Sequence, residues 1–307
     1  MTAVGMAEIK VSVIIPVYNT GEYLREAIDS VLAQTLDNVE TIVVNDGSTD
    51  NSADIIDGYG DRITVISKKN AGQAAARNDA LKIAKGRYIY FMDSDDWIDS
   101  DTLERCYDLC ERDNLDFCFF DAVSFGEEET GSGWQDYHRA AYYPGIRKGY
   151  EAMSEMLKDG RYRCSVCMSL FRTAFLEKFG IRFHPGIIHE DELFSAQVYF
   201  NANRIESLDA EFYHRRLRGE STMTKKFGKR NVDGYMTVID GCLEYVRTVA
   251  PDAGKACRQL VSTILLSMMQ NGYQLPLREK MRIVAAVLGH PYSFKFRPFC
   301  VLLLKRK

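Results

Sequence analysis

Hydrophobic positions in the first third of the chain alternate between two periods. Short runs rich in β-branched residues are typical of buried strands, and apolar residues spaced three and four apart are typical of amphipathic helices. The runs predict strands at 11–17, 39–44, 63–66, 88–92 and 117–123, with helices between them. Strands that alternate with helices favour right-handed crossovers and a mostly parallel sheet with helices on both faces.

Several polar residues and glycines predict where these helices begin and end. Asn19 with Glu22 resembles a capping box at the start of a helix that ends near Gln34. Gly86 is expected to end the helix that Asn70-Ala71-Gly72 opens, and Asp99 or Ser100 is expected to cap a helix that runs to about Arg112.

The pattern changes after Phe125. Residues 126–133 form an acidic, turn-rich stretch, and short strands mix with helices up to about Thr224. From Lys225 the spacing predicts a mostly helical segment, with apolar positions such as Tyr235, Val238 and Cys242. We therefore expect three parts, 8–123, 124–224 and a helical C-terminal extension at 225–307.

Composition narrows the class of protein. With 307 residues, 46% hydrophobic and 27% charged, the chain has the composition of a globular protein with a packed core. A net charge of −4 argues against nucleic acid as a partner. Neither a secretory signal nor a run of about 20 apolar residues is found, so we expect a cytoplasmic protein. The eight cysteines should then stay reduced, with Cys164 and Cys167 as structural thiols.

Polar residues follow several of the predicted strands. The first strand leads to Pro16, Tyr18 and Asn19, the second to Asp46 and the third to Asn70. The fourth leads to the acidic run Asp93-Ser94-Asp95-Asp96. Because the carboxyl ends of parallel strands share one edge, and ligands bind at that edge, these groups indicate a nucleotide-binding cleft.

Carboxylates in such a cleft suit a hard divalent cation. Mg²⁺ and Mn²⁺ prefer oxygen ligands, and Mg²⁺ takes only one or two protein carboxylates when phosphates fill other positions. The alternative for the acidic run is helix capping, although Asp99 and Ser100 are better placed for it. For Asp46 the alternative is a turn-forming residue before Gly47.

Four motifs in order resemble the family-2 inverting glycosyltransferases of the GT-A fold. They are VSVIIPVYN at 11–19, VVNDGSTD at 43–50, NAG at 70–72 with ARN at 76–78, and FMDSDD at 91–96. The resemblance covers about residues 10–110. It extends more weakly through HEDELF at 189–194 and RLRGEST at 216–222, where His214 and Arg215 depart from the tyrosines common in the family.

The resemblance implies a role for each matching position. Asp191 would be the catalytic base, and Asp95 would hold a Mn²⁺ or Mg²⁺ ion on the donor diphosphate. Donor-binding residues would be Pro16, Tyr18, Asp46, Asn70, Asp93, Arg216, Arg218 and Ser221. From the residues alone, Asp191 could equally favour a helix N-terminus, and the arginines could form a solvated face.

The activity implied is transfer of a sugar, with inversion, from a nucleotide diphosphate donor such as a UDP-sugar. The acceptor would be a hydroxyl of a saccharide or lipid-linked saccharide, in cell-surface polysaccharide or glycolipid synthesis. Residues 8–123 would be the nucleotide-sugar-binding half and 124–224 the acceptor-binding, catalytic half. A nucleotidyltransferase or a dehydrogenase is disfavoured because glycine-rich phosphate loops are missing after the first strand. A catalytically inactive sugar-binding protein on the same fold is the remaining alternative.

The C-terminal segment suggests a second partner. Aromatic and aliphatic residues from Phe294 to Leu304 are interspersed with Lys295 and Arg297 and followed by three basic residues. Such a mixture suits an anionic membrane surface, which would place the protein peripherally on the inner face of the cell membrane. The alternative is a helix packed on the domain with a solvated tail.

Overall fold

The computed structural model describes residues 8–126, 137–217 and 226–304. The chain divides into two compact units. The first comprises residues 1–148, 165–186 and 202–219, and the second comprises 149–164, 187–201 and 220–307. The predicted boundaries at 123/124 and 224/225 concern functional halves and stay a prediction.

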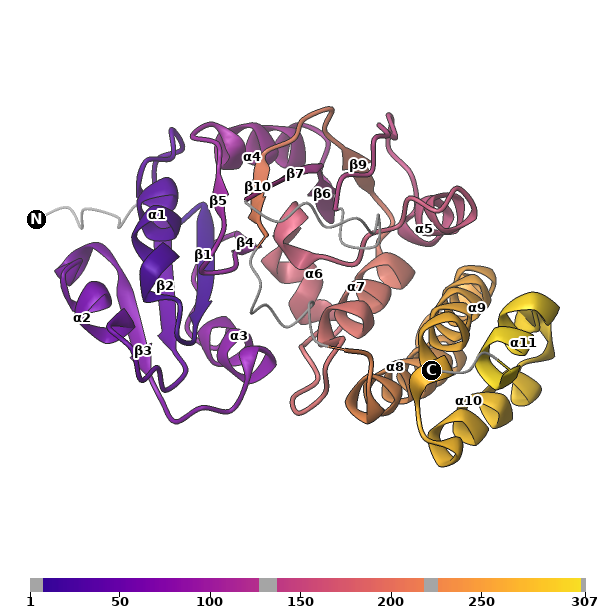
Figure 1. Ribbon diagram of the computed structural model, residues 1–307. Helices are drawn as coiled ribbons and strands as arrows, with labels where there is room; N and C mark the ends of the chain where they lie inside the picture. Colours follow the sequence, from indigo (N-terminus) through magenta and orange to yellow (C-terminus); the bar gives the residue numbers. More distant parts are fainter. Residues whose placement is uncertain (1–7, 127–136, 218–225, 305–307) are drawn as a thin grey trace, which may run out of the picture. The chain divides into compact units, whose positions relative to one another are not determined.

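A seven-stranded sheet forms the centre of the first unit (Figure 1), in the order β3-β2-β1-β4-β8-β6-β9. Its pairs are parallel except where β8 meets β4 and β6. The predicted α/β fold with a mostly parallel sheet is confirmed. The strands are β1 (Val11–Val17), β2 (Val39–Asn45), β3 (Thr64–Ser67), β4 (Tyr88–Phe91), β6 (Phe117–Phe119), β8 (Ser169–Arg172) and β9 (Ile205–Ser207).

Amphipathic helices connect these strands. In α1, Leu24, Ala27, Ile28 and Val31 recur at helical spacing and are all buried. The core of the sheet is the fully buried β1, which β2 and β4 flank. The helices of this unit are α1 (Gly21–Leu32), α2 (Ser52–Asp57), α3 (Gln73–Leu81), α4 (Thr102–Arg112) and α6 (Thr173–Lys178), with short 3₁₀ turns at Gly60–Arg62 and Val166–Met168.

A second, three-stranded sheet has the order β5-β10-β7, from β5 (Trp97–Ile98), β10 (Tyr213–Arg216) and β7 (Ala122–Phe125). The strand predicted at 117–123 is therefore wrong as one element. Its two halves, β6 and β7, belong to different sheets.

Three predicted helix boundaries are also wrong. The first helix has Thr20 as its N-cap, whereas Asn19 adopts a left-handed φ of 54° and bonds the backbone of Thr49. Helix α3 ends at Leu81, and Gly86 instead lies against the backbone of Ser12. Asp101 occupies the N-cap position of α4, and the carboxylate of Asp99 instead contacts His214 Nε2 at 2.9 Å.

The second unit is helical in its described parts, which confirms the predicted C-terminal helical extension. Its helices are α5 (Gly149–Lys158), α7 (Glu190–Asn201), α8 (Lys229–Thr248), α9 (Gly254–Asn271), α10 (Leu277–Gly289) and α11 (Phe296–Leu304), with 3₁₀ turns at Pro251–Ala253, Gly272–Gln274 and Pro291–Ser293. Helix α9 packs against α5, α8 and α11. Within the residues described, no helix is both long and apolar enough to cross a membrane.

All eight cysteines lie in the described ranges as free thiols. Cys167 is buried, and Cys164 is partly buried. Cys167 lies in the 3₁₀ turn Val166–Met168, directly before β8.

Candidate functional site

The sheet order reverses between β1 and β4. From β1 the chain runs outward through β2 and β3, and β4 then returns to pair with the other side of β1. In open α/β sheets, ligands bind outside the carboxyl ends of the strands at such a switch point. Tyr18 and Asn19 follow β1 there, and Asp93 to Asp96 follow β4.

A hydrogen bond joins the two sides of this switch point. The hydroxyl of Thr20, directly before α1, donates to the hydroxyl of Ser94 over 2.8 Å, and both residues are buried. The small side chain between Asp93 and Asp95 therefore ties the acidic loop to the end of β1. This hydrogen bond consequently holds the acidic loop next to the start of α1.

Helix α3 positions the first acid of the loop. Oδ1 of Asp93 accepts hydrogen bonds from Gln73 Nε2 at 2.7 Å and from Arg77 Nη2 at 2.9 Å. Arg77 is fully buried, and its guanidinium also lies 5.0 Å from the centre of the Phe183 ring. A buried arginine requires a charged partner, so the Arg77–Asp93 pair orients the carboxylate at the edge of the sheet.

The last acid of the loop connects it to the smaller sheet. The hydroxyl of Tyr213 donates to one oxygen of Asp96, and the backbone N–H of Arg216 donates to the other over 2.7 Å. Burial, together with the nearby charges of Asp95 and Asp93, raises the pKa of the Asp96 carboxyl well above its usual range. Asp96 therefore anchors the loop to β10, a role that the sequence analysis did not assign.

Arg216 lies beside Asp95. Its Nε donates to the backbone carbonyl of Asp95 over 3.2 Å, and its Nη2 pairs with Glu26. The guanidinium also stacks near the rings of Tyr23 and Phe125. A permanent positive charge thus lies next to the acidic loop.

Asp46 is held by backbone amides. Its two carboxylate oxygens accept hydrogen bonds from Ala71 N at 2.9 Å and Gly72 N at 2.8 Å, and the residue is buried. It therefore joins the end of β2 to the loop before α3. Gly72, the N-cap of that helix, has a φ of 89°, a conformation that glycine adopts readily.

The remaining predicted donor residues of the first unit also lie at this edge. Pro16 is buried in β1, next to Val44 of β2, and Tyr18 beyond it is 51% exposed. Asn70 is exposed in the loop that Asp46 holds. Arg218 and Ser221 lie outside the described residues.

The predicted base belongs to the second unit. Asp191 lies in the first turn of α7, between Glu190 and Glu192, so these acids do occupy a helix N-terminus. Burial raises the pKa of Glu192 to about 7, opposed by a hydrogen bond with the Cys164 thiol. Burial lowers the pKa of His189, directly before the helix, to about 4. The ionisable residues close to Asp191 in the sequence, His189 and Glu192, thus both have strongly shifted pKa values.

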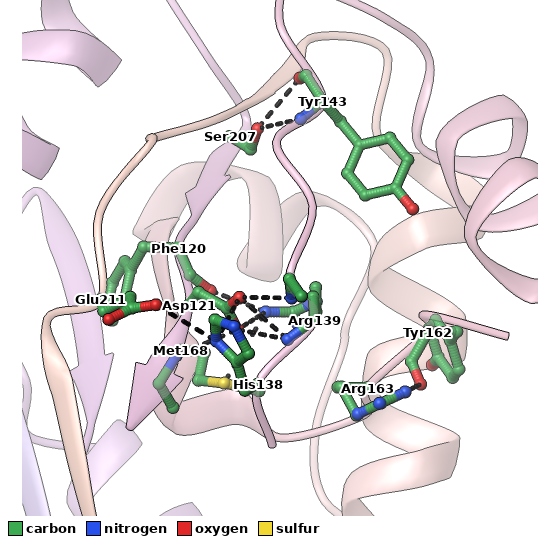
Figure 2. A network of polar contacts seen from close by, with 12 residues as sticks. Phe120, Asp121, His138, Arg139, Tyr143, Tyr162, Arg163, Met168, Ser207 and Glu211 are labelled. Atoms are coloured by element: carbon green, nitrogen blue, oxygen red, sulfur yellow. Dashed lines mark hydrogen bonds and ion pairs between the residues drawn. The ribbon is translucent and has the colours of Figure 1, made fainter. Parts of the chain in front are cut away.

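A further polar network in the first unit has a structural role (Figure 2). Asp121, which follows β6, accepts hydrogen bonds from the backbone amides of Arg139 and Ala140, and His138 Nδ1 lies between Asp121 and Glu211 at 3.2 and 3.3 Å. The buried Arg139 donates to the carbonyl of Phe120 over 2.7 Å. Because most of these groups bind backbone, the network fastens the segment after residue 136 to the sheet.

The acidic loop can supply few ligands for a metal. In the described parts of the chain, no group of three or more His, Cys, Asp or Glu residues could hold a metal ion. Asp93 and Asp96 bond Arg77 and Tyr213, and Asp95 is the one carboxylate that the family resemblance implies as a metal ligand. One carboxylate fits an ion that takes its other ligands from a diphosphate and water.

Comparison with known proteins identifies the family. The Glycosyl transferase family 2 model matches residues 12–180, more than half of the 307-residue chain. The chain therefore belongs to glycosyl transferase family 2, and the predicted family is confirmed. Its fold is that of the GT-A enzymes of this family.

Three similar proteins illustrate the relationship. Glycosyltransferase GlyA of Streptococcus pneumoniae is 33% identical over 216 residues, covering 68% of this chain and 31% of GlyA. The poly(ribitol-phosphate) beta-glucosyltransferase of Bacillus spizizenii is 33% identical over 218 residues, covering 67% of this chain and 32% of that protein. The crystal structure of S. aureus TarS 1–349 in complex with UDP-GlcNAc matches with a TM-score of 0.75 and 25% identity, covering 96% of this chain and 84% of TarS 1–349. The aligned part of this chain thus spans about a third of the length of the two curated relatives.

Proposed function

We propose that this chain is an inverting glycosyltransferase that moves a sugar from a UDP-sugar to an acceptor hydroxyl. The observation that carries the proposal is the acidic loop at the β1/β4 switch point, oriented by Arg77 and anchored through Asp96. The UDP-GlcNAc bound by TarS supports a UDP donor. The name of the Bacillus spizizenii relative supports a saccharide or other cell-surface polymer as the acceptor, and thus a role in polysaccharide synthesis.

The residues divide the work between donor and acceptor. Pro16, Tyr18 and Asp46 hold the base and Asp93 contacts the ribose or sugar, in the roles that the family motifs imply. Asp46 acts through the 70–72 loop, whose backbone it holds. Asp191 accepts the proton of the attacking hydroxyl, since a carboxylate within reach can act as a general base. A single displacement at the anomeric carbon then inverts its configuration.

A divalent ion, Mn²⁺ or Mg²⁺, completes the donor site in this proposal. Asp95 would hold it, and the ion would neutralise charge on the departing diphosphate as a Lewis acid. Arg216 adds a fixed positive charge beside Asp95 and needs no metal for this. Asp93 is assigned to the donor and not to the metal, because its Oδ1 already accepts hydrogen bonds from Arg77 and Gln73.

A donor panel tests the proposed activity. Nucleotide diphosphate release is measured for UDP-, GDP- and other nucleotide sugars, with manganese or a chelator and with saccharide acceptors. We expect UDP release that the chelator suppresses, and Asp95→Ala should abolish metal-dependent donor binding in calorimetry. Product NMR should show the inverted anomer. A protein that binds UDP-sugar but releases nothing with any acceptor is the inactive alternative and contradicts the proposal.

We also infer that the C-terminal helices contact an anionic membrane surface. Among the residues described, fourteen large apolar side chains are exposed, and eight of them lie between Leu277 and Leu304. On α11, Phe296, Cys300 and Leu303 recur at helical spacing on one side, yet Leu302 is the buried residue of this helix. Apolar area thus faces outward, as at a binding surface.

The charges of this segment favour lipid over another copy of the chain. Residues 272–304 carry five lysines and arginines and one acid, Glu279, which is buried against Arg282. The whole chain is acidic, with a net charge of −4, so this segment stands out from the rest. Basic residues beside exposed aromatic ones bind anionic lipid headgroups, at about 1 kcal/mol per cation.

Vesicle sedimentation tests this inference. The chain should sediment with phosphatidylcholine vesicles that contain phosphatidylglycerol and less with phosphatidylcholine alone. Lys295→Glu/Arg297→Glu should weaken binding at least about tenfold, and Phe296→Ser/Leu304→Ser should weaken it as well. Lys158→Glu/Lys255→Glu, the same charge change at exposed sites on α5 and α9, is the control. Equal loss in control and test variants, or a dimer that these changes dissociate without vesicle binding, contradicts the inference.

A further inference from the structure

The segment before α7 holds an uncommon backbone conformation. His189 has a φ of 71°, in the left-handed region that β-carbon-bearing residues rarely adopt. Its carbonyl accepts the N–H of Glu192 over 3.1 Å, which starts the first turn of the helix. The conformation of His189 therefore sets the direction in which α7 and its acids leave the loop. Such a conformation persists when surrounding groups hold it.

The N-terminal half of α8 supplies those surrounding groups. The ring of Tyr235 stacks on the imidazole of His189, with centroids 3.8 Å apart and planes 6° apart. Asn231 places its side-chain nitrogen 3.4 Å from His189 Nε2, within hydrogen-bonding reach. The carbonyl oxygen of Asn231's side chain accepts the backbone N–H of Gly228 over 2.9 Å, so the same residue also caps α8.

A glycine lets the two segments approach closely. A β-carbon on Gly234 would lie 2.3 Å from the carbonyl oxygen of Ile188, below any normal contact. Gly234 is buried in the N-terminal half of α8, inside the helix, where glycine costs roughly 0.5–1 kcal/mol relative to alanine. The close packing of α8 on the Ile188–His189 backbone is therefore a reason for glycine at this position.

We propose that α8 is a positioning element for the catalytic segment, acting through Asn231, Gly234 and Tyr235. This rests on the proposed role of Asp191 as the base. Backbone packing at Ile188 and ring stacking at His189 fix the first turn of α7, and Asp191 lies in that turn. A helical extension without catalytic motifs thus contributes to turnover, because misplacing a base by about 1 Å can cost about 100-fold in rate.

Gly234→Ala is the direct test. The added methyl must push Ile188 away, so kcat should fall at least about tenfold while the KM for the donor changes less than about twofold. Amide hydrogen exchange of residues 187–193 should accelerate. Gly289→Ala is the matched control, because a β-carbon on this helical glycine meets no atom within 4 Å. Unchanged kcat and exchange in Gly234→Ala would overturn the proposal.

A pair of substitutions at Tyr235 separates positioning from general stability. Tyr235→Phe keeps the ring over His189 and should retain kcat within about threefold, whereas Tyr235→Leu loses the stack and should behave as Gly234→Ala does. Equal kcat for the Phe and Leu variants contradicts the proposal. If the wild-type chain transfers no sugar, the proposed function fails, and hydrogen exchange of 187–193 still decides whether α8 holds this segment.

Discussion

At the scale of single residues, two groups on either side of Asp191 in the sequence have pKa values shifted in opposite directions. Burial lowers the pKa of His189 from 6.5 to about 4, and burial raises that of Glu192 from 4.5 to about 7. Both groups are therefore held in their neutral forms in the folded protein over much of the range between. Each shift is worth up to about 3 kcal/mol of differential stability.

These shifts predict opposing pH dependences of the free energy of unfolding. As pH falls from 6.5 to 4, the unfolded state protonates its histidine first, so the His189 contribution lowers stability. As pH rises from 4.5 to 7, the unfolded state loses its glutamate proton first, so the Glu192 contribution also lowers stability. Between about pH 4.5 and 6.5 the two contributions change in opposite directions with pH, so their pH dependences largely cancel.

Single substitutions should expose each contribution in urea unfolding measured from pH 4 to 7. Glu192→Gln leaves the histidine, so stability relative to wild type should rise with pH. His189→Asn, which tolerates a left-handed φ, leaves the glutamate, so relative stability should fall with pH. His184→Asn, at an exposed histidine, is the control. Parallel pH profiles for wild type and Glu192→Gln would show that Glu192 is not held protonated.

Sequence patterns found the acids of the site but not the residues that hold them. Asp93 and Asp95 stand out because an acidic run directly after an apolar strand calls for a structural or functional explanation. Arg77 and Thr20 do not, since a buried arginine and a bonded threonine look ordinary in a sequence. Their roles depend on partners 16 and 74 residues away in the chain, Asp93 and Ser94, which periodicity cannot pair.

At the scale of secondary structure, the sequence predicted strands β1, β2, β3 and β4 of the first sheet and the helices that alternate with them. Buried runs such as Val11–Val17 have a strong, nearly continuous apolar signal, because the strand is packed on both faces. The predicted strand at 117–123 was wrong because its apolar run passes from one sheet to the other. Hydrophobic residues face a core in both sheets, so the hydrophobic pattern does not show where the chain passes from one sheet to the other.

Helix starts were less predictable than strands for a related reason. Asn19 and Glu22 have the residue types of a capping box, but Asn19 serves the loop after β2 by accepting the N–H of Thr49 over 2.7 Å. Asp99 similarly contacts His214 in the smaller sheet. Polar residues that suit a cap also suit long-range contacts, and tertiary structure decided between them.

At the scale of the whole molecule, the proposed donor and acceptor chemistry belong to different units. The donor-side residues Asp46, Asp93 and Asp95 lie in the first unit, and Asp191 lies in the second. Donor affinity and proton transfer should therefore respond to different substitutions. Kinetic parameters can test this separation without any assumption about how the two units are arranged.

Asp191→Asn is the substitution that separates them most sharply. It keeps the size of the side chain but removes the proton acceptor, and general-base catalysis typically contributes ~10²–10⁴-fold. We expect turnover to fall by that range, while calorimetry gives a donor affinity within about twofold of wild type, because the proposed donor contacts are intact. Glu190→Gln, at the preceding residue of the same helix turn, is the control and should retain turnover. Turnover above about a tenth of wild type in Asp191→Asn contradicts the assignment, and a large loss in Glu190→Gln would move the base to Glu190. A donor affinity that falls together with turnover would contradict the separation, because Asp191 would then contribute to the donor site itself.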